Sequence, residues 1–426
     1  MPEYDLLVSG AHPWPAIGVV DGVIAGLAAG PAREAIDASG LLVLPGVVDA
    51  HVHFNEPGRT EWEGWATGSR AAAAGGVTTV CDMPLNSHPP VVTADAFDAK
   101  RTAAEARSLC DFALWGGLVP AHIDDLEPLA QRGVIGFKAF MAASGIDDFP
   151  KVDLGTLRAG MRRAAALGLP VAVHAEFDHA RPRGGTGVAD YLASRPIESE
   201  CEAIRCALDL AGETGCALHV VHVSSGRGAA LVFEGRARGI DVTAETCPHY
   251  LVFTDEDMLR LGAVAKCAPP LRSDGERAAL LDHVRAGRID TIGSDHSPSP
   301  WYMKAHDDFF QVWGGISGVQ HLLAVLLDMG LEIGLVARLT AEQVAGRFRL
   351  GSKGRIAVGY DADLTLVGVD DPHDVSGESL FYRHRVSPYV GRRLQARVRR
   401  TILRGRTVFC DGRLTTAGGG RLLKPR

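Results

Sequence analysis

The repeated alternation of two kinds of segment, which begins near residue 43, constrains the fold of this chain most strongly. Short apolar runs rich in β-branched residues are mostly followed by longer stretches with helical periodicity. The predicted strands are Val43–Phe54, Val77–Met83, Phe112–Leu118, Val134–Phe140, Pro170–Glu176, Ala217–Ser224, Asp241–Cys247 and Asp290–Asp295. The predicted helices include Thr60–Ala74, Ala94–Leu109, Asp153–Leu167 and Ser199–Thr214. Strands that alternate with helices predict a parallel sheet, and eight such units favour a closed (β/α)8 TIM barrel over a doubly wound open sheet.

The two ends of the chain depart from this rhythm. Short strands are predicted near both ends, and turn signals follow at Asp21-Gly22 and Asp411-Gly412. The strands are Tyr4–Ser9, Ala16–Val23, Ala362–Gly368, Val398–Leu403 and Thr407–Cys410. We therefore expect residues 1–48 and 352–426 to form one small β-sandwich domain, with the barrel of residues 49–351 inserted between its two halves.

The composition argues against several classes of partner. Of the 426 residues, 46% are hydrophobic and 22% are charged, which is typical of a large globular core. The net charge is −7 and Lys and Arg are scattered, so neither a nucleic acid nor a membrane is the expected partner. The eight cysteines form no C-x-x-C pair, no apolar run reaches about 18 residues, and the first residues lack a leader pattern. We expect a soluble, cytoplasmic protein with reduced cysteines and a small-molecule substrate.

Polar side chains stand at or near the ends of almost all predicted strands. They are His51, His53, Asp82, Lys138, His174, His222, Glu245 and Asp295. In a TIM barrel these carboxyl ends converge on the active site. His51 and His53 are two residues apart on a strand and point to the same face, so both imidazoles are able to bind one divalent metal. A single H-x-H is more often a pair of ordinary core histidines, but four histidines at strand ends favour metal binding.

Lys138 and Asp295 complete the predicted site. Lys138 lies in an apolar strand, where burial lowers the pKa of an amine; the neutral amine can then take up carbon dioxide to give a carbamate that bridges two cations. The alternative is an ion pair between Lys138 and an acid such as Asp82. Asp295 is predicted to bind a metal and to act as general base and then general acid, the alternative being an N-cap. Together these residues predict two metals that activate a water for attack on an amide carbonyl.

Several further residues give weaker signals. His219 points to the strand face opposite His222, so it is expected to contact a ligand or a helix rather than a metal. His249 is expected either to contact a ligand or only to hold a loop, and His296 is expected to contact a ligand. The run from Gly314 to Gly318 either offers backbone groups to a substrate or is a flexible turn.

These residues resemble a known family. Pro45–His53 is similar to the opening motif of the cyclic amidohydrolases, the group of dihydroorotase, hydantoinase and allantoinase. Similar segments follow in the family's order: Gly136–Met141, His174–Glu176, His222–Ser225, Glu245–Tyr250, Gly293–Pro298 and Lys353–Leu366. The resemblance implies that the metal ligands are His51, His53, Lys138, His174, His222 and Asp295, with Lys138 bridging two divalent ions as N6-carboxylysine. It places Asn55, Asn86 and Ser317 near the substrate and implies a homotetramer. Zinc is the expected metal, and cobalt, manganese or iron suit the same ligands.

The segment after the first histidine pair discriminates within this family. Phe54–Gly64 resembles the allantoin-hydrolysing members, whereas dihydroorotases carry an arginine at the position of Asn55, which suits a carboxylate-bearing substrate. Met83–Ser87 and Ala305–Gly318 have the same resemblance. It implies hydrolysis of the hydantoin ring amide of allantoin to give allantoate, in ureide degradation. The alternatives are dihydroorotase, hydantoinase or dihydropyrimidinase activity, or a non-catalytic homologue that acts as an assembly partner. Phe177, in place of an expected Asn, and Ser299–Met303 depart from the family pattern.

Overall fold

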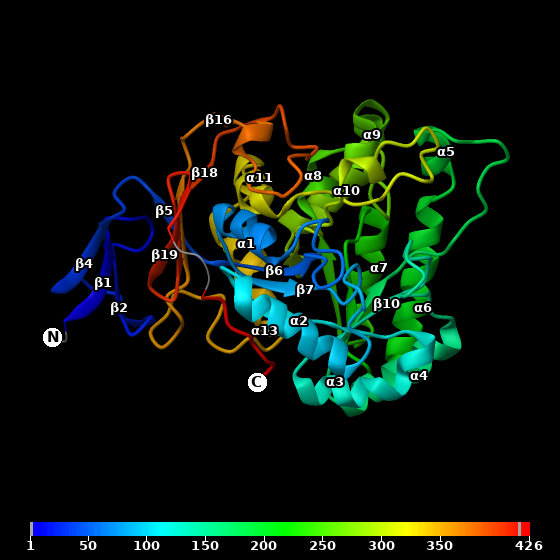
Figure 1. Ribbon diagram of the computed structural model, residues 1–426, viewed down its shortest axis with the longest axis horizontal. Helices are drawn as coiled ribbons and strands as arrows, with labels where there is room; N and C mark the ends of the chain where they lie inside the picture. Colours follow the sequence, from blue (N-terminus) through cyan, green and yellow to red (C-terminus); the bar gives the residue numbers. More distant parts are fainter. Residues whose placement is uncertain (1–2, 416–418) are drawn as a thin grey trace.

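Two groups of elements make up the structure. The computed structural model describes residues 3–415 and 419–426. Parallel strands surrounded by helices form the larger part, and sheets built from both ends of the chain lie on one side of it (Figure 1).

The parallel strands follow the order of the chain. One sheet contains β6 (Val47–Val52), β7 (Val77–Asp82) and β8 (Asp111–Leu114). The second contains β9 (Gly116–Gly117), β10 (Phe137–Phe140), β11 (Val171–His174), β12 (Leu218–Val220), β13 (Val242–Thr246) and β14 (Thr291–Ile292). Trp115 alone separates β8 from β9. A parallel bridge between Val52 and His296, with a 2.8 Å hydrogen bond from His53 N to His296 O, joins the segment after β14 to β6. The carboxyl ends of all these strands therefore lie at the same end of the ring.

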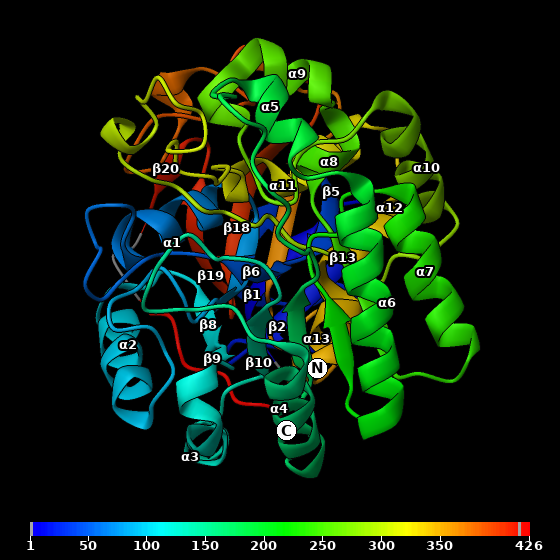
Figure 2. The same ribbon diagram turned by 90° about the vertical axis from the view of Figure 1, so that its right-hand side faces the viewer.

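Helices cover the outside of the strands. The longer ones are α1 (Trp65–Ala74), α2 (Ala94–Arg107), α4 (Leu154–Ala166), α6 (Ile197–Thr214), α7 (Gly226–Ala237) and α10 (Asp274–Arg285). Shorter ones are α3 (Leu126–Arg132), α5 (Val188–Ala193), α8 (Pro248–Val252), α9 (Asp255–Leu261), α11 (Leu322–Asp328), α12 (Ile333–Ala337) and α13 (Gln343–Arg347). Figure 2 shows α2, α3, α4, α6 and α7 outside the strands. α6 illustrates the cause, because Ile204, Ala207, Leu208 and Ala211 recur at helical spacing and are buried.

The two ends of the chain share one hydrophobic core. The first sheet has the order β3-β2-β1-β4, with β1 (Tyr4–Ser9), β2 (Ala16–Val20), β3 (Val23–Gly26) and β4 (Ala32–Asp37). The second has the order β20-β19-β18-β15-β5, with β5 (Leu42–Pro45), β15 (Leu364–Gly368), β18 (Arg397–Leu403), β19 (Arg406–Cys410) and β20 (Arg413–Leu414). A small hairpin pairs β16 (His373–Asp374) with β17 (Arg393–Leu394). Leu6, Ile17, Val43, Leu364 and Ile402 belong to one buried cluster, so the strands from both ends pack together.

The structure differs from the predicted strands at several places, and two of these have a clear physical cause. The predicted strand Val43–Phe54 is two strands, β5 and β6, which belong to different sheets and are separated at Gly46. A Cβ on Gly46 would lie 2.2 Å from Thr78 Oγ1, so the chain passes here too closely for a side chain. The strand β4 was not predicted, because half of its sequence, Ala-Arg-Glu-Ala-Ile-Asp, is charged and it contains only one β-branched residue. It forms by parallel pairing with β1.

Within residues 3–415 and 419–426, none of the helices combines the length and the apolar character needed to cross a bilayer. The eight cysteines all lie in these residues and are free thiols, as expected from the sequence.

Candidate metal centre

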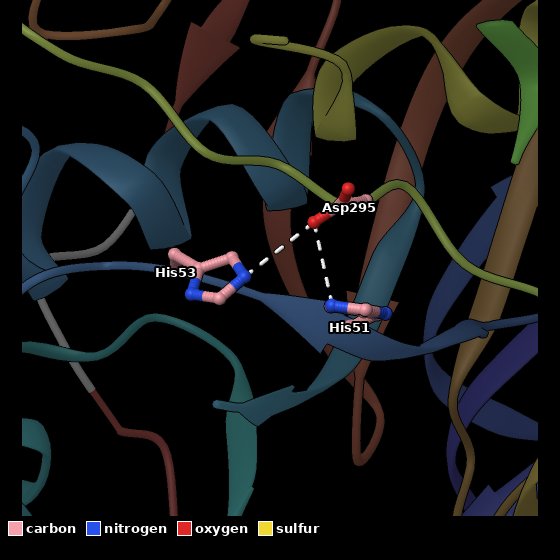
Figure 3. Close-up of side chains that lie close together, drawn as sticks. All are labelled: His51, His53 and Asp295. Carbon is pink, nitrogen blue, oxygen red and sulfur yellow. Dashed lines mark ion pairs between the residues drawn. The ribbon is translucent and has the colours of Figure 1, made fainter. Parts of the chain in front are cut away.

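His51, His53 and Asp295 meet at the carboxyl end of the strands (Figure 3). The Nε2 atoms of His51 and His53 lie 3.3 Å and 3.4 Å from the same carboxylate oxygen, Asp295 Oδ1. Burial raises the pKa of Asp295, but the two imidazoles outweigh this effect and hold the pKa at about 2. The carboxylate is therefore ionised at neutral pH and has a basic nitrogen on either side of it.

Glu245, at the end of β13, orients His51 from behind. Its Oε1 lies 2.7 Å from His51 Nδ1, and the same oxygen accepts the backbone N–H of His222 at 3.3 Å. Burial raises the pKa of Glu245, but His51 and His219 hold it well below its usual range. An ionised carboxylate at this position requires the proton of His51 on Nδ1, which leaves the lone pair of Nε2 directed at Asp295.

His219 stands behind Glu245. Its Nε2 lies 3.6 Å from Glu245 Oε2 and its Nδ1 lies 2.8 Å from Thr243 Oγ1. The sequence predicted such a contact behind the ligands, and the structure places His219 there.

His174 and His222 form a second pair of imidazoles. His174 Nδ1 lies 3.0 Å from His222 Nε2, and the centroid of the His222 ring lies 5.4 Å from that of His51. Burial lowers the pKa of both side chains, so both rings are neutral at neutral pH. Glu176 Oε2 lies 3.3 Å from His174 Nε2 and also pairs with Arg195. This carboxylate favours the tautomer of His174 that carries its proton on Nε2 and leaves a lone pair on Nδ1.

Lys138, on β10, is fully buried beside these histidines. Its Nζ has no hydrogen-bond partner among the described residues and lies 4.9 Å from the centroid of the Phe140 ring, which stacks on His174. Burial lowers the pKa of Lys138 to about 7. The alternative partner Asp82 instead pairs with Lys100 and accepts the backbone N–H of Phe54 at 2.7 Å. The ion pair between Lys138 and Asp82 is therefore not formed.

These donors fit a divalent metal site. Buried polar atoms without a hydrogen-bond partner in the described part of the chain include Lys138 Nζ, His53 Nδ1 and His222 Nδ1. Orphaned buried polar atoms are costly unless a ligand or a modification satisfies them. Neutral imidazoles with a carboxylate are the ligand set of zinc and similar ions, whereas magnesium and calcium prefer oxygen ligands.

A cavity of about 80 Å³ opens over this group. His51, His53, His174, His222 and Asp295 line it together with Leu85, Asn86, Phe140, Ala143, Ser144, Cys267, Ala268, Ser297, Trp313, Gly314 and Gly315. Of the three residues expected near the substrate, Asn86 lines the cavity, but Asn55 and Ser317 do not. Asn55 is buried and donates to Pro298 O at 3.4 Å, and Ser317 O accepts from Ser387 Oγ at 2.7 Å. Both support the loops beside the cavity. Ser144 and Cys267 were missed because nothing in their own sequence context marks them.

The backbone is strained at four positions in and beside this site. Asn55, Asn86, His222 and Asp295 have φ values of 64°, 69°, 41° and 46°. Residues other than glycine seldom adopt this left-handed region, which costs of order 1–3 kcal/mol each and persists where the surroundings enforce it. His222 and Asp295 lie just beyond the ends of β12 and β14, so the chain turns sharply where each side chain enters the cavity.

Two other histidines lie behind the cavity. Both nitrogens of His249 lack a hydrogen-bond partner within the described residues, and burial lowers its pKa to about 4. His296 Nδ1 accepts the backbone N–H of Gly318 at 3.2 Å, and burial lowers its pKa to about 3. Neither side chain lines the cavity.

A second group of acids lies far along the strands from this site. Asp111, Asp361 and Asp363 surround Lys353, whose Nζ lies 2.6–2.8 Å from one oxygen of each. The ammonium occupies the position that a cation would take. This cluster instead links β8 to the segment that leads into β15.

The comparisons with known proteins agree with this arrangement. Residues 42–408 match the Amidohydrolase family, and the chain belongs to that family. Proteins named allantoinase from Solibacter usitatus and Rubrobacter xylanophilus are 54% and 55% identical to it; the matches cover 96% of this chain and 93% and 94% of theirs. Among solved structures, L-hydantoinase (dihydropyrimidinase) from Arthrobacter aurescens superimposes with a TM-score of 0.95 at 33% identity, covering 99% of this chain and all of that one. The family and the relatives expected from the motifs are thus confirmed.

Proposed function

We propose that this protein is a metal-dependent cyclic amidohydrolase that hydrolyses the hydantoin ring amide of allantoin to give allantoate. The observation that carries the proposal is the meeting of His51, His53 and Asp295 in a chain more than half identical to proteins named allantoinase. Sibling activities are less well supported. Hydantoinases are similar at 33% identity or less, and the cavity lining includes no Arg or Lys within the described residues to pair with the carboxylate of dihydroorotate.

We assign six residues to the metal centre: His51, His53, His174, His222, Asp295 and Lys138, the last as a carbamate. The short contacts around Asp295 Oδ1 and between His174 and His222 support the four histidines and the aspartate. The burial of Lys138, its lowered pKa and its unpartnered Nζ support carboxylation, because carbon dioxide reacts with the neutral amine. When bound, two divalent ions, with zinc expected, supply an activated water and polarise the amide carbonyl.

Asp295 moves the proton in this mechanism. Its pKa of about 2 keeps the carboxylate ready to accept the proton of the attacking water. As the ring carbon–nitrogen bond breaks, Asp295 returns that proton to the leaving nitrogen, and the former carbonyl carbon becomes a carboxylate. Glu245 keeps His51 in one tautomer throughout.

The architecture that we assign is a (β/α)8 barrel of residues 49–351 carrying the site, with a small β-sandwich of residues 1–48 and 352–426. The closing bridge from His296 to Val52 and the shared core of both chain ends support this division. We also propose that the protein is a cytoplasmic homotetramer, for which the free cysteines and the family resemblance are the support.

The test is an assay of purified protein on allantoin, dihydroorotate and dihydrouracil, with metal analysis of the same preparation. We expect allantoin to be hydrolysed best, activity to be lost on chelation, and divalent metal to restore it. Preferred turnover of dihydroorotate would contradict the substrate assignment. Well under one divalent ion per chain, in protein prepared with bicarbonate, would favour the non-catalytic assembly partner.

A further inference from the structure

One wall of the cavity is an extended loop with little regular structure. The segment 299–318 follows Asp295 and contains one 3-10 turn, Trp301–Met303, before the turn that begins at Val319. Trp313, Gly314 and Gly315 of this loop line the cavity. The loop has no strand ladder or long helix of its own, and its regular contacts at the wall are few: a bridge joins Ile316 to His296, and Gly315 N donates to Lys266 O at 2.8 Å. Side-chain contacts therefore contribute to fixing the position of this wall.

Two buried lysines bind the carbonyl groups of the loop. Lys266 Nζ donates to Phe309 O and Val312 O, both at 2.6 Å, and to Phe310 O at 3.4 Å. Lys304 Nζ donates to Gly315 O at 2.9 Å, Trp313 O at 3.1 Å and Ala263 O at 3.2 Å. Lys266 precedes the loop in the sequence, and its side chain binds carbonyl groups of the loop. Lys304 belongs to the loop, and its side chain also binds Ala263 O, which lies shortly before Lys266 in the sequence.

The donors of both lysines are fully used. An ammonium group has three N–H donors, and each of these two groups contacts three carbonyl oxygens. The side chains are 4% and 5% exposed, and neither forms an ion pair with a carboxylate in residues 3–415 and 419–426. In its charged form, a lysine in this environment has no free donor or lone pair for a substrate. Its contribution is to hold carbonyl groups in place.

We propose that Lys266 and Lys304 are positioning residues that set the Trp313–Gly315 wall of the substrate cavity. The kinetic part of this proposal rests on the proposed function, since it concerns the binding of the cyclic ureide against that wall. Charge-assisted hydrogen bonds to Val312 O, just before the wall, and to Trp313 O and Gly315 O within it fix its backbone and hold Trp313 in the cavity lining. Removing either ammonium group frees several carbonyls and lets the wall open.

The charge of both lysines is sensitive to pH. Burial lowers the pKa of Lys266 to about 7, with Arg195 and Lys304 adding to this effect and Asp308 opposing it. Burial lowers the pKa of Lys304 to about 8, and Cys267 is the titratable group that opposes this shift. The rings of Tyr191 and Phe309 lie 4.7 Å and 5.1 Å from Lys266 Nζ. Loss of a proton from either lysine weakens its hydrogen bonds to the carbonyl groups of the loop. The wall therefore becomes more mobile as the pH rises.

The experiment uses the full-length metal-loaded enzyme with Lys266→Met, Lys304→Met and both together, and Lys424→Met as a matched change at an exposed lysine. Hydrogen exchange of the segment 299–318 should be at least about tenfold faster in the three test variants, with exchange of α4 and α6 unchanged. KM for allantoin should rise at least about tenfold while kcat stays within about threefold. The double variant should be little worse than either single one, because both lysines hold the same wall.

Several outcomes would overturn the proposal. If the variants fold and hydrogen exchange of the segment 299–318 is unchanged, the proposal is wrong. A lower melting temperature with an unchanged KM would also contradict it, because that result indicates a purely structural role. If wild-type protein fails to hydrolyse allantoin, the proposed function fails, while the exchange measurement still decides the role of the lysines. If the variants do not fold, exchange of wild-type protein from pH 7 to 9 replaces them. The hydrogen-exchange rate of the segment 299–318, divided by that of α6, should then rise with pH. A ratio that stays constant from pH 7 to 9 would refute the proposal.

Discussion

Replacing Glu245 with Gln tests how the side chains of the proposed metal centre are oriented. This buried carboxylate lies 2.7 Å from His51 Nδ1 and its pKa is held low, so the substitution removes a negative charge while keeping the size of the side chain. A hydrogen bond to a charged group contributes about 1.5–3 kcal/mol. Loss of the charge should therefore weaken metal binding about 10- to 100-fold, the range found for carboxylates behind metal-bound histidines.

Glu63 provides a matched control. It is also fully buried, but burial raises its pKa to about 8, so at pH 7 it is mostly protonated. Glu63→Gln then replaces one neutral group with another and should change metal affinity less than about threefold.

The assay is a metal titration in chelator buffers at pH 7, with kcat/KM for allantoin measured at saturating metal. Equal losses of affinity in the two variants would refute the reasoning, because the charge on Glu245 would then not be the cause. Full metal affinity in Glu245→Gln would show that His51 needs no carboxylate behind it.

Three other predictions follow from the same geometry. Lys138→Ala should abolish hydrolysis, and a short-chain carboxylic acid should restore part of it by taking the bridging place; a fully active variant would exclude that role. Asp295→Asn should lower kcat by about 10²- to 10⁴-fold, measured at saturating metal, since the proton acceptor is lost; a smaller effect would place the general base elsewhere. His321 is buried and its pKa is lowered from 6.5 to about 3, so its neutral form stabilises the fold above pH 6.5 and this contribution is lost as the pH falls towards 3. In His321→Gln the melting temperature should fall less steeply between pH 6.5 and 4, and an unchanged slope in a pH series of melting curves would contradict the assignment.

Much of the fold follows from local patterns. The apolar β-branched runs predicted the strands β6 to β14, because strands of a parallel sheet covered by helices are buried on both faces and leave a continuous apolar run in the sequence. The failures have the opposite cause. β4 lacks an apolar β-branched run and forms through its pairing with β1, and the break at Gly46 depends on Thr78, a residue 32 positions away. A local pattern carries no record of such partners.

The proposed metal centre shows the same difference between what local patterns predict and what long-range contacts decide. The sequence alone placed His51, His53, His174, His222, Lys138 and Asp295 at strand ends, since strand direction determines which end of a barrel a residue reaches. Which acid pairs with which base was decided by the tertiary structure. Asp82 ends β7 and Lys138 lies on β10, but Lys100 from α2 pairs with Asp82 and leaves Lys138 without a partner among the described residues. Asn55 and Ser317 belong to loops beside the cavity, and their contacts with Pro298 and Ser387, which lie far away in the sequence, are not visible in any local pattern. The sequence determined the chemical groups and the end of the barrel where they gather, and long-range packing determined their partners, because distances between side chains on different strands depend on the whole ring.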